Sequence, residues 1–204
     1  MTHALVVLSV GTDHHPFGRL VDWMVEWGRA HPEHKLIMQR GTVPAPEDFE
    51  SHELIPHDQL RELFRSATAV VSHGGPSTVM DARMAGRLPI VVGRDPARGE
   101  HVDGHQLRFA AHLGHHELAR VASTRDELFA LLDEALAEPE AFQIPLQEIE
   151  ASAGVAEFGR VLDDLLGIET RLRLYELSGA DEREAQRRMV EDRRRDDRET
   201  GSTS

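Results

Sequence analysis

The feature that most constrains this chain is a regular alternation between short apolar runs and longer stretches that carry a helical apolar stripe. The run at residues 4–10 is rich in β-branched residues and ends at Gly11, which is typical of a strand buried on both faces. The next stretch has Leu20, Met24 and Trp27 at the spacing of one helix face. Strands that alternate with helices in this way predict an α/β fold around a mostly parallel sheet.

The same pattern continues through most of the sequence. Further strands are expected at 36–38, 52–55, 69–72, 89–92 and 118–121, and further helices around 60–64, 76–85 and 103–112. Thr124 and Glu127 are spaced as a capping box, which predicts the start of another helix that runs to Leu136. The expected architecture is therefore a Rossmann-like, mostly parallel sheet with helices on both faces.

The composition along the chain predicts three segments. An α/β domain is expected over residues 1–140, a helical extension over 141–177, with a further helix at 158–165, and a charged tail over 178–204. The tail holds 8 acidic and 7 basic residues and almost no apolar ones, so it buries too little surface to offset the entropy of ordering. It is expected to be disordered, or to order on a partner, and the extension either docks a partner or folds back on the domain.

Charge and residue usage exclude several classes of protein. Lys and Arg number 23 against 36 for Asp and Glu, and this net charge of -13 argues against a nucleic-acid binder. The absence of cysteine excludes disulfide scaffolds, thiolate metal sites and cysteine nucleophiles. No apolar run approaches the roughly 20 residues of a membrane span, and no secretion signal opens the chain. A cytoplasmic protein without a membrane span is expected.

The residues after the strand at 69–72 predict a binding loop, because ligands of open parallel sheets bind at the carboxyl ends of the strands. Gly74 and Gly75 lack side chains where a ligand could approach the backbone, and Pro76 suits the first position of a helix. The free N–H groups of that first turn favour a phosphate, and the hydroxyls of Ser77 and Thr78 add donors.

Asp81 follows Ser77 by one helical turn, where a carboxylate suits the two hydroxyls of a ribose. The alternative is that the glycines make a tight turn and that Asp81 is simply solvated. His101 and His105 lie four residues apart, but no third ligand stands at an evident spacing, so no metal is predicted. The dinucleotide and ATP-hydrolysis glycine motifs are absent, and no cofactor is expected.

The segments 10–12, 72–82, 89–92 and 103–106, together with Gly86, resemble the C-terminal domain of glycosyltransferase family 28. The resemblance runs from about residue 4 to 137. It is greatest to the stand-alone donor-binding subunit of two-component transferases, such as those that add N-acetylglucosamine to a lipid-linked sugar. This resemblance implies the C-terminal half of a GT-B glycosyltransferase, and a hexosyltransferase that inverts the anomeric centre.

The resemblance also implies roles for individual residues. The residues expected to bind the nucleotide sugar are Gly11, Thr12, His73, Gly74, Gly75, Ser77, Thr78, Asp81, Asp103, His105 and Gln106. Among them, Gly11 and Thr12 line the phosphate side, Asp81 takes the ribose, and His105 with Gln106 takes sugar hydroxyls. The segment 55–57 would lie near the uracil. The family usually has Glu in place of Asp81, and Phe109 stands near the place of a family asparagine, so the donor sugar is open.

Because the donor-type domain begins near residue 4, the sequence predicts half an active site. The expected partners are a UDP-sugar donor and a membrane-associated acceptor-binding subunit, which would bring the lipid-linked acceptor and recruit this chain to the inner face of the membrane. No general base is assigned, because His14, His15 and His73 either assist acid–base chemistry or cap loops. The alternative function is a non-catalytic regulatory protein that binds nucleotide sugars.

Overall fold

The computed structural model of the chain describes residues 3–102 and 104–145, the side chain of His105 excepted. Asp103, the expected helix at 158–165 and the charged tail at 178–204 lie outside these residues. The predicted boundaries at 140 and 177 therefore stay predictions.

A six-stranded sheet forms the centre of the described part. Its strands are β1 (Leu5–Ser9), β2 (Lys35–Gln39), β3 (Glu50–His52), β4 (Ala69–Ser72), β5 (Ile90–Val91) and β6 (Arg120–Val121). They are ordered β3-β2-β1-β4-β5-β6, and every neighbouring pair is parallel. The chain moves outward from β1 to β3 and then returns to the other side of β1 at β4. This reversal is the topological switch point of a Rossmann-like sheet, and it confirms the predicted fold.

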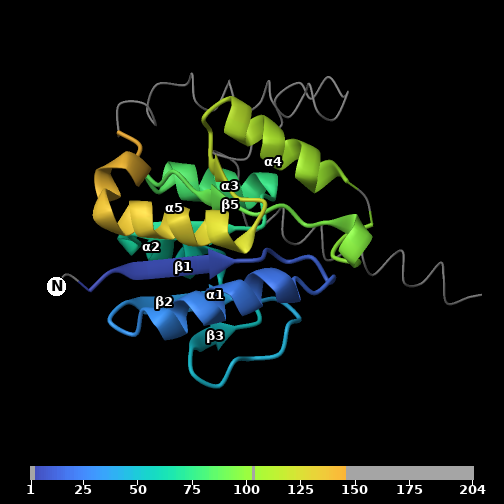
Figure 1. Ribbon diagram of the computed structural model, residues 1–204, viewed down its shortest axis with the longest axis horizontal. Helices are drawn as coiled ribbons and strands as arrows, with labels where there is room; N and C mark the ends of the chain where they lie inside the picture. The colour runs from blue at the N-terminus through green and yellow to red at the C-terminus, as the bar shows by residue number, and fades with distance from the viewer. Residues whose placement is uncertain (1–2, 103, 146–204) are drawn as a thin grey trace, which may run out of the picture. The chain divides into compact units, whose positions relative to one another are not determined.

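Helices cover both faces of the sheet (Figure 1). The helices α1 (Gly18–Ala30) and α5 (Arg125–Ala137) pack on one face, and α2 (His57–Ser66), α3 (Pro76–Met84) and α4 (His105–His115) lie on the other. Successive residues of β1 pack on opposite faces of the sheet. Val6 and Leu8 belong to the core under α1, and Val7 belongs to the core under α2. Two short 3₁₀ helices, η1 (Pro96–Arg98) and η2 (Pro139–Phe142), complete the described elements.

Several predicted boundaries differ from the structure. The strand expected at 52–55 is β3 at Glu50–His52, and Ile55 lies beyond it because its N–H donates to Gln39 Oε1 at 3.0 Å instead of to a neighbouring strand. Of the strand expected at 118–121, only Arg120–Val121 pairs. The helix expected at 103–112 begins at His105 and extends to His115. The capping box of Thr124 and Glu127 is confirmed, with both of its hydrogen bonds present.

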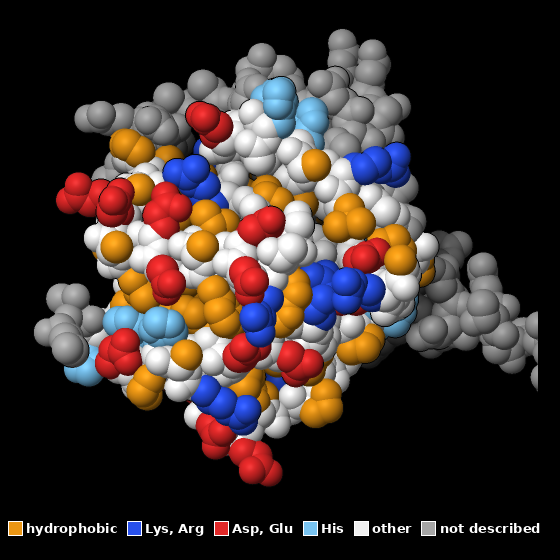
Figure 2. Space-filling model, viewed as in Figure 1, with side chains coloured by type: hydrophobic (Ala, Val, Ile, Leu, Met, Phe, Trp, Pro, Cys, Tyr) orange, Lys and Arg blue, Asp and Glu red, His pale blue; other side chains and the backbone are white. Residues whose placement is uncertain are grey.

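Acidic and basic side chains are interspersed over the face that carries α1 and α5 (Figure 2). Within the described residues, no helix has the length and apolar character needed to cross a membrane.

Candidate functional site

Three loops meet at the carboxyl edge of the sheet, which is the right-hand edge in Figure 1. The loop after β1 and the loop after β4 leave from adjacent strands at the switch point. The loop after β5 is bonded to the loop after β1, since Arg94 donates to the carbonyl of His15 at 2.6 Å. A switch point of this kind is where open α/β sheets bind their ligands. The structure thus brings together the loops that the sequence singled out.

The N-terminus of α3 has no hydrogen bond to a capping side chain among the described residues. Gly75 is the N-cap residue, no side chain of the described residues bonds to this end, and Pro76 occupies the first turn. Ser77 is exposed and Thr78 is half-buried, so hydroxyls flank the open end. The first turn of a helix presents unpaired N–H groups and about half a positive charge. This end of α3 is therefore suited to an anion such as a phosphate.

The glycines of these loops face the protein interior. A β-carbon on Gly75 would lie 2.2 Å from His73 Nε2, and one on Gly11 would lie 2.4 Å from His73 Cε1. Gly74 has φ +81°, and its β-carbon would lie 2.8 Å from Val91 Cγ1. Protein atoms therefore lie where these side chains would be, and the predicted reason for the glycines, the approach of a ligand to the backbone, stays a prediction. The glycines make room for the imidazole of His73 and for Val91.

His73 is buried, with 7% of its surface exposed. Burial, joined by the charge of Arg94, lowers the pKa of its imidazole to about 4. Its Nδ1 has no hydrogen-bond partner within the described part of the chain. A base acting near neutral pH needs a pKa close to that pH. This lowered pKa argues against His73 as an acid or base near neutral pH, and its ring fills the space between Gly11 and Gly75.

Replacing Gly75 with alanine is expected to destabilise the protein by about 1–3 kcal/mol, because the new methyl group overlaps the His73 ring. Gly75 has φ −65°, which alanine adopts without strain, so the overlap is the whole cost. Denaturant unfolding of Gly75→Ala, His73→Ala and the double variant measures the coupling between the two sites. The double variant should be less destabilised than the sum of the single ones, and strict additivity would contradict the packing described here.

Asp81 lies one turn along α3 from Ser77, as predicted. Its carboxylate accepts a hydrogen bond from His57 Nε2–H at 3.0 Å, where Asp81 has 18% of its side chain exposed and His57 has 53%. His57 is the first residue of α2 and follows Ile55 and Pro56, the segment expected near a uracil. The structure thus joins the expected ribose contact to the expected base contact.

The loop after β5 holds a buried cation that the sequence analysis missed. The Arg94 side chain is fully buried, and it donates to the carbonyls of Val10 at 2.9 Å, His15 at 2.6 Å and Glu100 at 3.1 Å. The Glu100 carboxylate is buried as well, and both of its oxygens accept from Arg19 at 2.8 Å. These contacts join the loop after β1 to the loop after β5. An arginine next to a strand end is too common a pattern to have predicted them.

The other residues predicted to contact the donor lie in the loop after β1 and around the start of α4. Thr12 is exposed in the loop after β1, and Gln106 is half-buried in the first turn of α4. The Gln106 Oε1 atom is buried and has no hydrogen-bond partner among the described residues. Asp103 lies outside the described residues, as does the side chain of His105.

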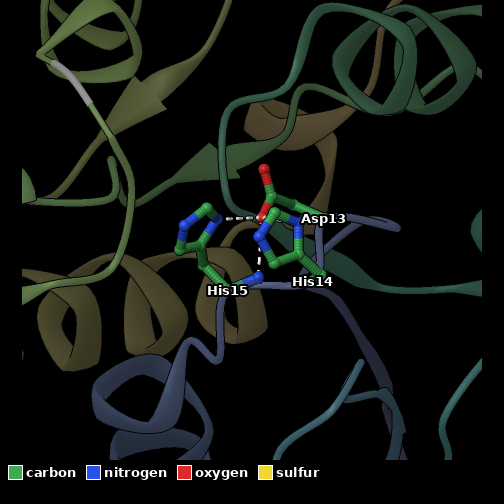
Figure 3. Close-up of side chains that lie close together, drawn as sticks. All are labelled: Asp13, His14 and His15. Atoms are coloured by element: carbon green, nitrogen blue, oxygen red, sulfur yellow. Dashed lines mark hydrogen bonds and ion pairs between the residues drawn. The ribbon is translucent and has the colours of Figure 1, made fainter. Parts of the chain in front are cut away.

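A carboxylate surrounded by imidazoles stands in the loop after β1 (Figure 3). The Nδ1–H and the backbone N–H of His15 both donate to Asp13 Oδ1, each at 2.7 Å. His14 Nδ1 lies 3.8 Å from the same oxygen, and His101 Nε2 lies 3.5 Å from Asp13 Oδ2. Partial burial raises the pKa of Asp13, but the two bonds from His15 and the charge of Arg94 outweigh it and leave that pKa below its usual value.

The family model of the glycosyltransferase family 28 C-terminal domain matches residues 21–159, which is more than half of the chain. The chain belongs to this family. A search of curated proteins gives no match.

Among solved structures, a glycotransferase of kitacinnamycin is similar with a TM-score of 0.53 and 18% identity over 80% of this chain and 40% of that one. The calicheamicin glycosyltransferase has a TM-score of 0.47 and 19% identity, over 80% of this chain and 39% of that one. A spinosyn forosaminyltransferase has a TM-score of 0.48 and 19% identity, over 81% of this chain and 40% of that one. The chain thus spans about two fifths of the length of these structures. At these identities the similarity concerns the fold, which is that of the C-terminal half of a GT-B glycosyltransferase.

Proposed function

We propose that the chain binds a UDP-sugar at the carboxyl edge of its sheet and is the donor-binding part of an inverting glycosyltransferase. The observation that carries the proposal is the uncapped N-terminus of α3 at the switch point, with the Asp81 carboxylate one turn along the same helix. In a member of this transferase family, that pairing of an anion site with a hydroxyl acceptor fits a nucleoside diphosphate.

Each part of the site then has a chemical task. The first turn of α3 and the hydroxyls of Ser77 and Thr78 stabilise the negative charge that develops on the leaving diphosphate. Asp81 accepts hydrogen bonds from the ribose hydroxyls, and Gln106 holds hydroxyls of the sugar. Gly11 and Thr12 line the phosphate side. In a single displacement, the acceptor oxygen bonds to the anomeric carbon as the bond to the diphosphate breaks and its electron pair leaves with the diphosphate.

The acceptor side of the proposal rests on the family resemblance. We propose that the acceptor is lipid-linked, that a membrane-associated acceptor-binding subunit presents it and supplies the general base, and that this subunit brings the chain to the membrane. A regulatory protein that only binds nucleotide sugars would need no such subunit. Affinity purification of the tagged chain from its native cells distinguishes the two, because only a transferase component should copurify with an acceptor-binding protein.

A thermal-shift series with UDP and several UDP-sugars tests donor binding. A ligand at 100 times its dissociation constant stabilises the folded state by about 2.7 kcal/mol. For a chain of this size, the expected rise in melting temperature is roughly 5–11 °C. If no nucleotide or nucleotide sugar shifts the melting temperature, the proposal is wrong.

Asp81→Asn should weaken the binding of UDP and of UDP-sugars alike, by about 10- to 100-fold, because a hydrogen bond to a charged group is worth about 1.5–3 kcal/mol. Isothermal titration calorimetry gives both dissociation constants. The matched control is Asp22→Asn, the same change at an exposed position of α1, which should leave both constants unchanged. Gln106→Ala should weaken the sugar nucleotide more than UDP itself, and equal losses would contradict its placement.

A further inference from the structure

The proposed function leaves one group of residues without a task, namely the imidazoles around Asp13. We propose that Asp13, His15 and His101, with His14 as a fourth ligand, form a binding site for a divalent transition-metal ion such as Zn²⁺. The binding of the ion does not depend on the proposed function.

The distances bring the imidazole nitrogens close to the two oxygens of the Asp13 carboxylate. The potential ligand atoms of Asp13, His14 and His15 all lie within 4.8 Å of one another. Neighbouring ligands of a tetrahedral zinc ion, each about 2.0–2.1 Å from the metal, are about 3.3 Å apart. His15 Nδ1 and His14 Nδ1 lie 2.7 and 3.8 Å from Asp13 Oδ1, and His101 Nε2 lies 3.5 Å from the other carboxylate oxygen, Oδ2, so the separations lie on both sides of this value. An ion would take the place of the proton that His15 Nδ1 now donates to Asp13.

The site is held in place before any ion binds. His101 comes from the loop after β5 and the other ligands come from the loop after β1, and Arg94 bonds these two loops together. The side chains of Asp13, His15 and His101 have 25%, 24% and 18% of their surface exposed, whereas His14 has 84%. Asp13, His15 and His101 are therefore largely sheltered, whereas His14 is open to solvent and gives an ion a route of entry.

The donor atoms indicate the class of ion. Imidazole nitrogens with one carboxylate suit Zn²⁺, Co²⁺, Ni²⁺ and Cu²⁺, whereas Mg²⁺ and Ca²⁺ prefer oxygen ligands alone. A carboxylate is ionised near neutral pH at its ordinary pKa, as a metal ligand must be. The chain contains no cysteine, so no thiolate competes for the ion.

A second cluster provides an internal control. His31, Glu33 and His34 also bring three potential ligand atoms within 4.8 Å. The Nδ1 lone pair of His34 accepts the N–H of Ala4 at 3.3 Å, so the neutral ring carries its proton on Nε2 and offers no free lone pair. Both imidazoles also stack with Trp27, at centroid distances of 4.8 and 6.2 Å. The first cluster binds an ion under this proposal and the second does not.

Equilibrium dialysis of the full chain, stripped of metal with a chelator, against Zn²⁺ tests the site. One equivalent is expected to bind saturably. His15→Ala, His101→Ala and Asp13→Asn should each weaken binding by at least about 10- to 100-fold, the loss seen when even an outer partner of a metal ligand is removed. His31→Ala and His34→Ala should leave the affinity unchanged. Co²⁺ provides a second readout, because a tetrahedral nitrogen and oxygen site gives visible absorption bands that His15→Ala should abolish.

Three results would overturn the proposal: no saturable binding of Zn²⁺, loss of binding in the His31 or His34 variants instead, or equal small losses in all the histidine variants. Thermal unfolding in chelator shows whether each variant is folded before its affinity is interpreted. Dialysis without nucleotide keeps the outcome separate from donor binding. A chain that binds Zn²⁺ but no UDP would retain this site and refute the proposed function.

Discussion

Replacing Arg94 with methionine is expected to lower the free energy of unfolding by about 3–5 kcal/mol. The substitution keeps much of the side-chain volume but removes the guanidinium. Three carbonyl oxygens in two loops, those of Val10, His15 and Glu100, would lose their donor. A buried acceptor without a partner costs about 1–3 kcal/mol, and the three losses come from one site.

The surroundings of Arg94 leave no easy replacement for these bonds. Its side chain has no exposed surface, and the guanidinium lies 4.9 Å from the centre of the Phe17 ring, which is itself fully buried. Burial lowers the pKa of Arg94, while the Asp13 and Glu100 carboxylates oppose that change. The bonds to Val10 and Glu100 are buried and the bond to His15 is partly buried, so at least two of the three carbonyls would be left without a partner when the guanidinium is removed. We therefore expect the two loops to separate at the edge where the proposed ligand site lies.

Chemical denaturation of the wild type and the variant measures this loss, with the metal chelated throughout. The matched control is Arg98→Met, four residues further along the same loop. Arg98 has 63% of its side chain exposed and, among the described residues, its one ion pair is with Asp95 at 3.3 Å, so its removal should cost less than about 1 kcal/mol. Arg94→Lys should fall between the two, since an ammonium group keeps the charge but does not span three acceptors. A loss below 1 kcal/mol for Arg94→Met would refute the role assigned to the buried guanidinium.

Local patterns explain why so much of the fold was predictable. The alternation of strands and helices, the β4 strand at Ala69–Ser72 and the capping box of α5 depend on residues within a few positions of one another. The end of β3 was not predictable in this way. Its position depends on Gln39, whose side chain bonds to Ile55 from 16 residues away and draws that residue out of the strand.

For the candidate site, its position was predictable from the sequence, but its internal contacts were not. Its place at the strand ends follows from the fold class and from the glycine loop, both of which the sequence shows. Its internal contacts join residues that are distant in sequence, such as Arg94 and Val10, which are 84 positions apart, and His57 and Asp81, which are 24 apart. The contact of Gly11 and Gly75 with His73 was not predictable, because no local pattern shows that the His73 ring turns back between these glycines.

The free energy of unfolding is expected to fall by about 3 kcal/mol between pH 6.5 and pH 4 because of His73. Burial lowers the pKa of its imidazole from the ordinary 6.5 to about 4 in the folded chain. Between these values the unfolded chain binds a proton at this position and the folded chain does not. The contribution is therefore complete above pH 6.5 and is lost progressively below it. A change of about 2.5 pKa units corresponds to about 3 kcal/mol.

His73→Gln isolates this contribution, because the substitution removes this imidazole and leaves the other histidines in place. Unfolding free energies measured from pH 4 to 7, with chelator present, should fall less steeply in the variant, with the difference between the two curves confined to the window between the two pKa values. NMR titration of the wild type gives a reading that needs no variant. The His73 ring signals should keep the shifts of a neutral imidazole down to about pH 5, where an unperturbed imidazole is almost fully protonated. A midpoint near 6.5 would mean that water reaches the ring, and the packing of His73 against Gly11 and Gly75 would then be wrong as well.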